Sequence, residues 1–395
     1  MEQLQLWSQR AVLGVETSFK RYLAAKIRWQ NRLIVITGAR GTGKTTLMLQ
    51  RMKESLSLDE SLYVSLDNLY FATHTLTDLA EAFVQRGGRY LFLDEIHKYP
   101  NWSVEVKNVY DHLPDLHLVL SGSSATELLR SQGDLSRRAL FYHLQGLSFR
   151  EFLAYTGRAA LDVIALEDLL KNPLDAARTI LEKVKPLAFF REYLVSGYYP
   201  FFREDPEGYH QRLRQVLNAV LETDIPAVFP IDYYSVWKVK KLLEVISEMV
   251  PFKPNVKKLS DQIGISRDTL IRYLQYLAKA DILLLLYSQN KGVSLLNKPE
   301  KIYLNNTNLA YALSSSLQTG TARETFFANQ LSPGHRLRFS RQGDFLVDDS
   351  YVFEVGGRKK GHRQISGLKN AFVVADDLEL PVAGKIPLWL FGFLY

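Results

Sequence analysis

The sequence predicts an α/β fold in which a mostly parallel sheet is followed by a helical region and smaller mixed modules. Up to about residue 147, short apolar runs alternate with amphipathic segments of helical period, which is typical of βαβ units. A glycine-rich stretch at residues 38–45 lies between a predicted strand and a predicted helix. An apolar run at residues 90–93 ends in the carboxylates of Asp94 and Glu95.

Strands and helices alternate throughout this first part. The predicted strands lie at residues 33–37, 62–66, 90–93, 116–120 and 140–144. The predicted helices lie between them, at residues 45–55, 77–85, 103–112 and 125–131. Because helices separate consecutive strands, we expect the strands to run mostly parallel in one sheet.

The strand pattern stops near residue 149 and is replaced by helical spacing. Helices are predicted at residues 149–155, 166–170, 174–183, 209–222 and 236–249. A compact helix–helix–hairpin module follows the prolines at 250–254, and from residue 324 the pattern returns to strands and turns. The expected divisions are an N-terminal helical segment, a sheet core, a helical lid or linker region, the compact module and a C-terminal domain, at residues 1–24, 25–150, 151–249, 250–313 and 314–395.

Composition excludes several classes of function. The chain has 395 residues and no cysteine, so disulfides, thiolate catalysis and cysteine-ligated metals are absent. Its net charge of +7 permits a polyanionic partner without requiring one. Residues 1–10 carry no apolar core after a basic start, so we expect no signal peptide, and no apolar run is long enough to span a bilayer. We therefore expect a cytoplasmic protein without a membrane partner.

The glycine-rich stretch matches the phosphate-binding loop, or P-loop. Glycines let successive backbone N–H groups point at phosphates, and the following helix directs its positive end toward them. Lys44 is expected to reach the β- and γ-phosphates of ATP, and the Thr45 hydroxyl to hold Mg²⁺. The expected nucleotide-binding residues are Gly38, Ala39, Arg40, Gly41, Thr42, Gly43, Lys44, Thr45 and Thr46.

The acidic pair after the third predicted strand completes the expected ATP site. Asp94 is expected to bind Mg²⁺, and Glu95 is the candidate general base that activates water. A strand inserted between the P-loop strand and this one, with Glu beside the metal-binding Asp, marks the branch of P-loop proteins that includes AAA-type ATPases. The alternative for Glu95 is a carboxylate that only caps a helix.

Polar residues after the next strand are further catalytic candidates. Ser121 or Ser123 is expected to lie near the γ-phosphate and orient water, unless the serines only cap the predicted helix at 125–131. Arg138 is the candidate arginine finger, acting on the nucleotide of its own chain or of a second copy. The alternative is that Arg137 and Arg138 form a solvated basic pair.

The motif order resembles prokaryotic AAA-type ATPases that carry a C-terminal domain of unknown function, and the resemblance covers nearly the whole chain. It implies an ATPase core, a winged-helix module and a C-terminal domain similar to the restriction-endonuclease fold, but no known substrate. The matching segments are residues 38–46, 94–98, 121–124, 136–138, 146–152, 196–200, 343–347 and 353–355.

The module at 250–313 is the winged-helix candidate. A glycine turn separates a helix near 258–263 from a second helix at 267–279, capped by Ser266. Strands at 282–287 and 301–304 would form the wing. Such a module binds DNA through an exposed polar face, or serves as a protein-contact module. The candidate nucleic-acid residues here are Arg267, Arg272, Gln275 and Lys291.

The C-terminal domain carries acids that resemble those of nucleases with the restriction-endonuclease fold. Glu324, Asp344 and Glu354 match, but Gly356 stands where such enzymes need a lysine. We therefore expect a fold kept for binding, with nuclease activity as the alternative. Arg358, Lys359 and Lys360 begin a basic run that either contacts phosphates or is a solvated turn.

Three functions are compatible with these features. The first is an Mg²⁺-dependent ATPase whose nucleotide state controls a DNA-associated module. The second is a nucleotide-dependent switch for a protein partner, and the third is an ATP-regulated nuclease. DNA, a protein partner and a second copy of the chain are the candidate macromolecular partners.

Overall fold

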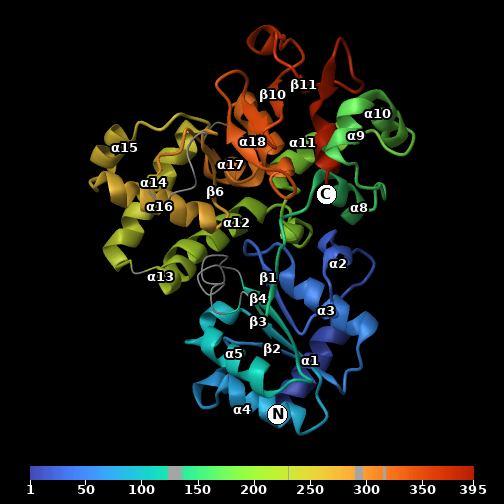
Figure 1. The fold of residues 1–395 in the computed structure, drawn as a ribbon, viewed down its shortest axis with the longest axis vertical. Coiled ribbons are helices and arrows are strands. Elements are labelled where there is room, and N and C mark those ends of the chain that lie inside the picture. The colour runs from blue at the N-terminus through green and yellow to red at the C-terminus, as the bar shows by residue number, and fades with distance from the viewer. Residues whose placement is uncertain (123–134, 136, 230, 290–296, 315–316) are drawn as a thin grey trace. The chain divides into compact units, whose positions relative to one another are not determined.

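The computed structural model describes residues 1–122, 135, 137–229, 231–289, 297–314 and 317–395 (Figure 1). The chain divides into two compact units. Unit 1 consists of Met1–Gly146 and Ala219–Ile231, and unit 2 consists of Leu147–Asn218 and Asp232–Tyr395.

The apolar runs of unit 1 form a five-stranded parallel sheet, as the sequence predicts. Its spatial order is β2-β3-β4-β1-β5, so the P-loop strand β1 lies beside β4, and β3 separates β4 from β2. Each described strand begins within one residue of its predicted start. The strands are β1 (Leu33–Thr37), β2 (Ser61–Ser65), β3 (Tyr90–Asp94), β4 (His117–Gly122) and β5 (Leu140–His143).

Alternation along β1 divides the core of unit 1 into two layers. Leu33 and Val35 face α4 (Leu76–Val84) and α5 (Trp102–His112), whereas Ile34 and Ile36 face α3 (Lys44–Ser55). Side chains alternate between the two faces of a strand, and every residue of β1 is buried. The result is a three-layer α/β arrangement with helices on both faces of the sheet (Figure 1).

Short elements complete unit 1. The helix α1 (Glu2–Gly14) contacts β2, where the Ser8 hydroxyl accepts a hydrogen bond from Tyr63 N. The second segment of the unit is a π-helical turn, η4 (Val220–Asp224), followed by α13 (Ile225–Val228), which contacts η2. The remaining elements are α2 (Leu23–Lys26), η1 (Leu69–Ala72) and η2 (Ile96–Lys98). The helix predicted at 125–131 lies outside the described residues.

The helical region of unit 2 follows the predicted spacing with two differences: α11 (Leu187–Ser196) is added, and the helix predicted at 209–222 ends at Ala219, directly before the π-helical turn η4. The helix α11 was not predicted, because three aromatic side chains between 189 and 193 obscure the polar face. Asn308 ties this region together by accepting hydrogen bonds from Tyr198 N and the Tyr209 hydroxyl. The other elements are α8 (Phe149–Tyr155), α9 (Leu166–Lys171), α10 (Pro173–Leu181), η3 (Pro200–Arg203), α12 (Tyr209–Ala219) and α14 (Tyr233–Met249).

The segment after α14 contains two capped helices and a two-stranded hairpin. The helix α15 (Val256–Ile263) ends at Gly264, whose φ of +73° favours glycine, and Ser266 caps α16 (Arg267–Lys279) by accepting from Thr269 N at 3.2 Å. β6 (Leu283–Leu286) pairs antiparallel with β7 (Lys301–Leu304). The paired strands lie at the predicted positions.

The C-terminal part contains a second, mixed sheet of order β12-β11-β10-β9-β8. β10 pairs parallel with β11 and antiparallel with β9. The elements are α17 (Thr307–Leu313), α18 (Thr319–Leu331), β8 (Leu337–Phe339), β9 (Phe345–Val347), β10 (Tyr351–Gly356), η5 (Arg363–Ile365), β11 (Ala371–Ala375), β12 (Lys385–Pro387) and η6 (Leu388–Phe393).

The prediction of strands and turns from residue 324 onward is wrong for residues 324–331, which belong to α18. This helix is buried on most of its circumference, including Asn329 and Gln330, so it lacks the alternation of polar and apolar faces that reveals a surface helix. Within the described residues, no helix has both the length and the apolar character needed to cross a membrane.

Candidate ATP site

The loop between β1 and α3 has the backbone geometry that the P-loop motif requires. Gly38 has a φ of +148°, and a Cβ added there would lie 2.3 Å from Leu144 O. Gly43 has a φ of +94° and stands directly before α3. Glycine is therefore required at 38 by both conformation and space.

Lys44 begins α3 and is held over this loop. Its side chain is buried, and Nζ donates to Gly38 O at 2.8 Å and Ala39 O at 2.9 Å. The amino end of the 12-residue helix α3 directs the N–H groups of its first turn and a positive partial charge into the same space. This combination of an ammonium and oriented backbone N–H groups fits the phosphates of a nucleotide.

Arg21 fixes the loop from a distant part of the sequence. It is 6% exposed, and its guanidinium donates to Thr42 O, to Gln145 O at 2.7 Å and to Gly146 O at 2.9 Å. The sequence did not identify Arg21, because a single arginine outside any motif has no distinguishing pattern. Its planar fork of donors joins the P-loop to the segment after β5.

Asp94 ends β3 and is a centre of hydrogen bonding. Its Oδ2 accepts from the Thr45 hydroxyl at 2.6 Å and from the Tyr63 hydroxyl at 2.9 Å, and its Oδ1 accepts from the Ser121 hydroxyl. Burial, together with the charge of Asp94, raises the pKa of Tyr63, which therefore remains a protonated donor. The structure thus brings together three residues predicted for the site, Thr45, Asp94 and Ser121, and adds Tyr63.

Glu95 leaves the strand at a sharp turn. Its φ of +52° lies in the left-handed region, and its backbone N–H donates to Asp94 Oδ1 at 3.0 Å. Its carboxylate Oε2 lies 3.3 Å from His97 Nε2, and that nitrogen lies 3.7 Å from Asp224 Oδ1. The side chains of His97 and Asp224 are 0% and 1% exposed, whereas that of Glu95 is 21% exposed. The Glu95 carboxylate therefore contacts the buried His97, which lies next to the buried Asp224, and it retains access to solvent.

His97 lies within a predicted motif, but its role was not predicted, and Asp224 comes from the distant segment Ala219–Ile231. The sequence grouped that segment with the helical region 151–249. A carboxylate 127 positions after its histidine neighbour gives no local signal, so only the three-dimensional structure pairs them.

The side-chain oxygen atoms at this site are suitable ligands for a divalent cation. The Thr45 hydroxyl and the Asp94 carboxylate are hard oxygen ligands in direct contact, which suits Mg²⁺ better than a soft metal. Glu95 adjoins this pair and is hydrogen-bonded through its backbone to the same carboxylate. The arrangement can bind a nucleotide phosphate with Mg²⁺ and present a carboxylate base to water.

Arg138 lies away from this group. Its Nε and Nη2 donate to Asp111 Oδ1 and Oδ2, each at 2.9 Å, and this pairing lowers the pKa of Asp111. Arg138 precedes β5 and Asp111 precedes β4. Both therefore lie at the amino ends of the parallel strands, whereas the P-loop lies at their carboxyl ends. A four-residue strand spans roughly 13 Å. Arg138 therefore does not contact the nucleotide site of its own chain in this conformation. Ser123 lies outside the described residues.

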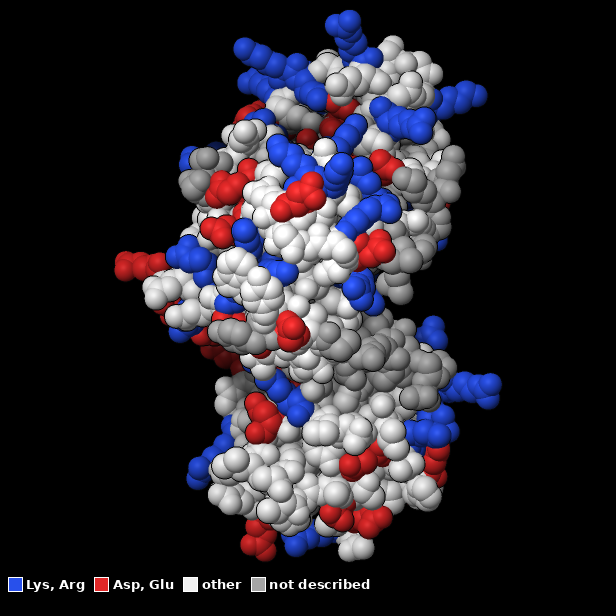
Figure 2. All heavy atoms as spheres, turned by 90° about the vertical axis from the view of Figure 1, so that its left-hand side faces the viewer, with Lys and Arg blue, Asp and Glu red and all other residues white. Residues whose placement is uncertain are grey.

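The candidate nucleic-acid residues differ in their availability. Arg267 and Arg272 are exposed on α16, whereas Gln275 donates to the Tyr287 hydroxyl. Arg358 and Lys359 are exposed, but Lys360 is paired with Glu354. Figure 2 shows one face of the molecule, on which acidic side chains lie among the basic ones. Lys291 lies outside the described residues.

The C-terminal carboxylates are engaged with lysines. Lys301 Nζ lies 2.6 Å from Glu324 Oε2 and 3.5 Å from Asp344 Oδ1, and Lys360 binds the fully buried Glu354. Burial raises the pKa of the Glu354 carboxyl, and the hydrogen bond from Lys360 opposes that shift. Among the described residues, no three His, Asp or Glu side chains are arranged to hold a metal.

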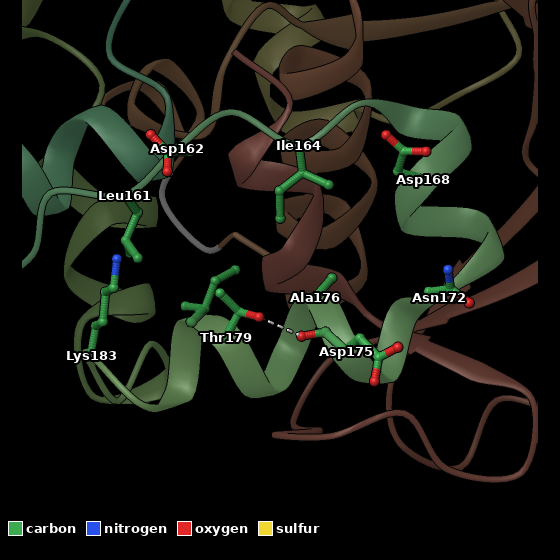
Figure 3. A pocket seen from close by; sticks show the side chains of 10 residues that line it. Leu161, Asp162, Ile164, Asp168, Asn172, Asp175, Ala176, Thr179 and Lys183 are labelled. Atoms are coloured by element: carbon green, nitrogen blue, oxygen red, sulfur yellow. Dashed lines mark hydrogen bonds between the residues drawn. The ribbon is translucent and has the colours of Figure 1, made fainter.

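A separate cavity of about 330 Å³ lies beside α9 and α10 (Figure 3). Apolar side chains such as Ile164 and Ile180 line it together with Asp162, Asp168 and Lys183. It contains none of the residues predicted for a functional site.

Comparison with protein families matches residues 30–153 to a family described as an AAA domain. The match includes the P-loop, Asp94, Glu95 and Ser121. This match agrees with the P-loop fold of the five-stranded parallel sheet and of the glycine-rich loop after β1. Residues 187–320 match a domain of unknown function (DUF8612). The second match spans the end of the helical region and the module at 250–313 and assigns neither a winged helix nor an activity.

One relative extends along most of the chain. The uncharacterized protein MJ1637 of Methanocaldococcus jannaschii is 28% identical over 371 residues, which cover 85% of this chain and 78% of that protein. Solved structures match more distantly. They include NtrX from Brucella abortus in complex with ADP, at 14% identity and a TM-score of 0.27, covering 70% of this chain and 72% of NtrX. AMPPCP-bound DnaA from Aquifex aeolicus matches at 13% identity and a TM-score of 0.24, covering 69% and 86% of the two chains.

Proposed function

We propose that this chain is a Mg²⁺-dependent cytoplasmic ATPase whose nucleotide state controls a DNA-associated module in unit 2. The observation that carries the enzymatic part is the contact between Thr45 and Asp94 beneath the P-loop, with Glu95 next in sequence. The DNA part is supported by the exposed arginines of α16 and by the net positive charge.

In the proposed hydrolysis of ATP, each residue of the site has its own role. Lys44 and the N–H groups at the start of α3 bind and orient phosphates, and Thr45 and Asp94 hold the cation. Glu95 accepts a proton from the attacking water, and His97 with Asp224 limits the rotation of its carboxylate. Bound ATP supplies the phosphoryl group, and Mg²⁺ supplies positive charge against its oxygens.

ATP turnover measured with and without DNA tests both parts of this proposal. We expect Mg²⁺-dependent phosphate release that rises when duplex DNA is added. If DNA does not change ATP turnover and the protein does not bind DNA at low salt, the protein-interaction switch is favoured. Absence of ATP binding would contradict the proposal altogether.

An arginine finger acting between copies of the chain is expected to reveal itself by complementation. Arg138→Ala should retain ATP binding and lose turnover, because the transition-state charge loses a cation. Mixing it with Lys44→Ala protein should restore part of the rate, since the latter supplies Arg138 to an intact site. Asp111→Asn is the matched control, because it removes the ion pair and keeps the arginine. If mixing restores nothing, Arg138 has no role across an interface.

Duplex binding through α16 is expected to depend on salt. Replacing both Arg267 and Arg272 with alanine should reduce the slope of log affinity against log salt concentration by about two, because each phosphate contact releases counterions. ATP turnover without DNA should stay unchanged. Arg358→Ala combined with Lys359→Ala is the comparison. If only that pair lowers affinity, the C-terminal sheet binds DNA and α16 does not.

The nuclease alternative receives no support from the ion pairs of the C-terminal sheet. Lys301 and Lys360 occupy carboxylates that a divalent metal would need, and Gly356 follows Glu354 by two positions. We infer that these acids stabilise the sheet. Nicking of supercoiled DNA with Mg²⁺ or Mn²⁺, lost in Asp344→Asn, would contradict this inference.

A further inference from the structure

Two exposed aromatic rings lie next to each other on the first turns of α14. Tyr234 and Trp237 are 63% and 52% exposed. Their ring centroids are 6.1 Å apart, and the angle between the ring planes is 18°. Core packing does not account for a pair of large aromatic side chains with most of their surface in water, and such a patch is typical of a binding surface.

Lysine side chains accompany both rings. Lys238 Nζ lies 4.6 Å from the Tyr234 ring centroid, and Lys241 Nζ lies 5.4 Å from that of Trp237. Residues 232–244 carry three lysines and two carboxylates, Asp232 and Glu244, so the segment has a net charge of +1. The surface therefore combines flat apolar groups with positive charge, which complements a ligand made of flat bases and phosphates.

This surface adjoins the turn between α15 and α16. Lys238 Nζ donates to the backbone oxygen of Gly264 at 2.9 Å, and Gly264 ends α15. Three positions later, the exposed Arg267 begins α16. The positive charge of the α14 face thus continues toward the arginines of α16 within unit 2.

We propose that Tyr234, Trp237, Lys238 and Lys241 form a binding site for single-stranded DNA. Bases stack on the two rings, and the ammonium groups pair with phosphates. A single strand is required because a duplex exposes base edges and not base faces. The recognising groups are ring faces and ammonium groups, which do not read a 2′-hydroxyl. The proposal extends the DNA-associated role proposed for unit 2, but it does not require duplex binding by α16.

Fluorescence anisotropy with a labelled oligothymidylate of about 12 nucleotides at low salt tests the site. Base–aromatic stacking contributes about 1–3 kcal/mol per base by alanine substitution, so Tyr234→Ala and Trp237→Ala should each weaken binding about fivefold or more. Trp237→Phe should retain most of the affinity. Trp7→Ala is the matched control, because Trp7 is 45% exposed on α1 of unit 1, and it should bind as the wild type does.

An abasic oligomer of the same length separates stacking from charge. The wild type should bind it more weakly than oligothymidylate, and the double alanine variant should bind both equally. Unchanged binding in the alanine variants, or no binding by the wild type, would overturn the site. Because these groups do not read a 2′-hydroxyl, the matching RNA should bind about as tightly as the DNA, and clearly tighter binding of RNA would contradict this mode of recognition. If Trp237→Ala abolishes self-association of the protein and the wild type does not bind the oligonucleotide, the face is an interface with a second copy of the chain. ATP turnover without DNA should be unchanged in every variant, which distinguishes this test from that of the ATPase.

Discussion

Replacing Lys44 with alanine is expected to weaken ATP binding by at least about 30-fold. Removing one partner of a desolvated, charge-assisted contact costs about 2–5 kcal/mol. Lys44 is buried at the loop, and its ammonium lies within hydrogen-bonding distance of two P-loop carbonyl oxygens. Titration with a fluorescent ATP analogue in the presence of Mg²⁺ measures the change directly.

The control for this substitution is Lys107→Ala, which removes an exposed lysine from α5 of the same unit. It should bind ATP as the wild type does. Circular dichroism should show that both variants are folded. Nucleotide affinity that is undiminished in the Lys44 variant would refute the assignment of the P-loop.

Glu95→Gln is expected to bind ATP normally and to turn it over at least about 100-fold more slowly. The carboxamide keeps the size of the side chain and can still lie beside His97, but it cannot accept a proton from water. A single-turnover assay separates this chemical defect from a defect in binding or product release.

Glu81→Gln provides the comparison, since Glu81 is exposed on α4 and its substitution makes the same chemical change. Its turnover should match the wild type. A near-normal rate in the Glu95 variant would place the general base elsewhere and leave the P-loop assignment intact.

The sheet of unit 1 could be predicted because its signals are local. Each strand is a short apolar run, and the glycine loop and the acidic pair stand directly after strands β1 and β3. In a parallel sheet the carboxyl ends of the strands meet at one edge, so Lys44, Asp94 and Ser121 converge from separate motifs. Sequence order and the direction of the strands were sufficient to predict that these residues converge.

The supporting residues could not be predicted because their partners are distant in sequence. Arg21 contacts the P-loop and residues 145–146, and Tyr63 reaches Asp94 from the middle of β2. An arginine or tyrosine in such positions has the same sequence signature as a surface side chain. Burial and hydrogen-bond partners distinguish the two, and both depend on the completed fold.

The position of Arg138 also required the structure. Sequence order places it after a serine motif near the nucleotide, but Arg138 stands two residues before β5, at the amino ends of the strands and not at the carboxyl ends where the P-loop lies. Similarly, α18 escaped prediction because a helix surrounded by core has no polar face. In both cases the missing information was the path of the chain through space.

The discontinuous composition of unit 1 affects how the protein is made. The ribosome delivers Asp224 and the buried apolar residues of α13 only after residues 147–218. These residues nevertheless belong to the core of unit 1, because α13 contacts η2 and Asp224 lies beside His97, the neighbour of the Glu95 carboxylate. Cotranslational folding of the nucleotide-binding unit therefore cannot finish when its last strand emerges. A nascent chain halted between β5 and residue 219 would expose part of that core to solvent and to chaperones.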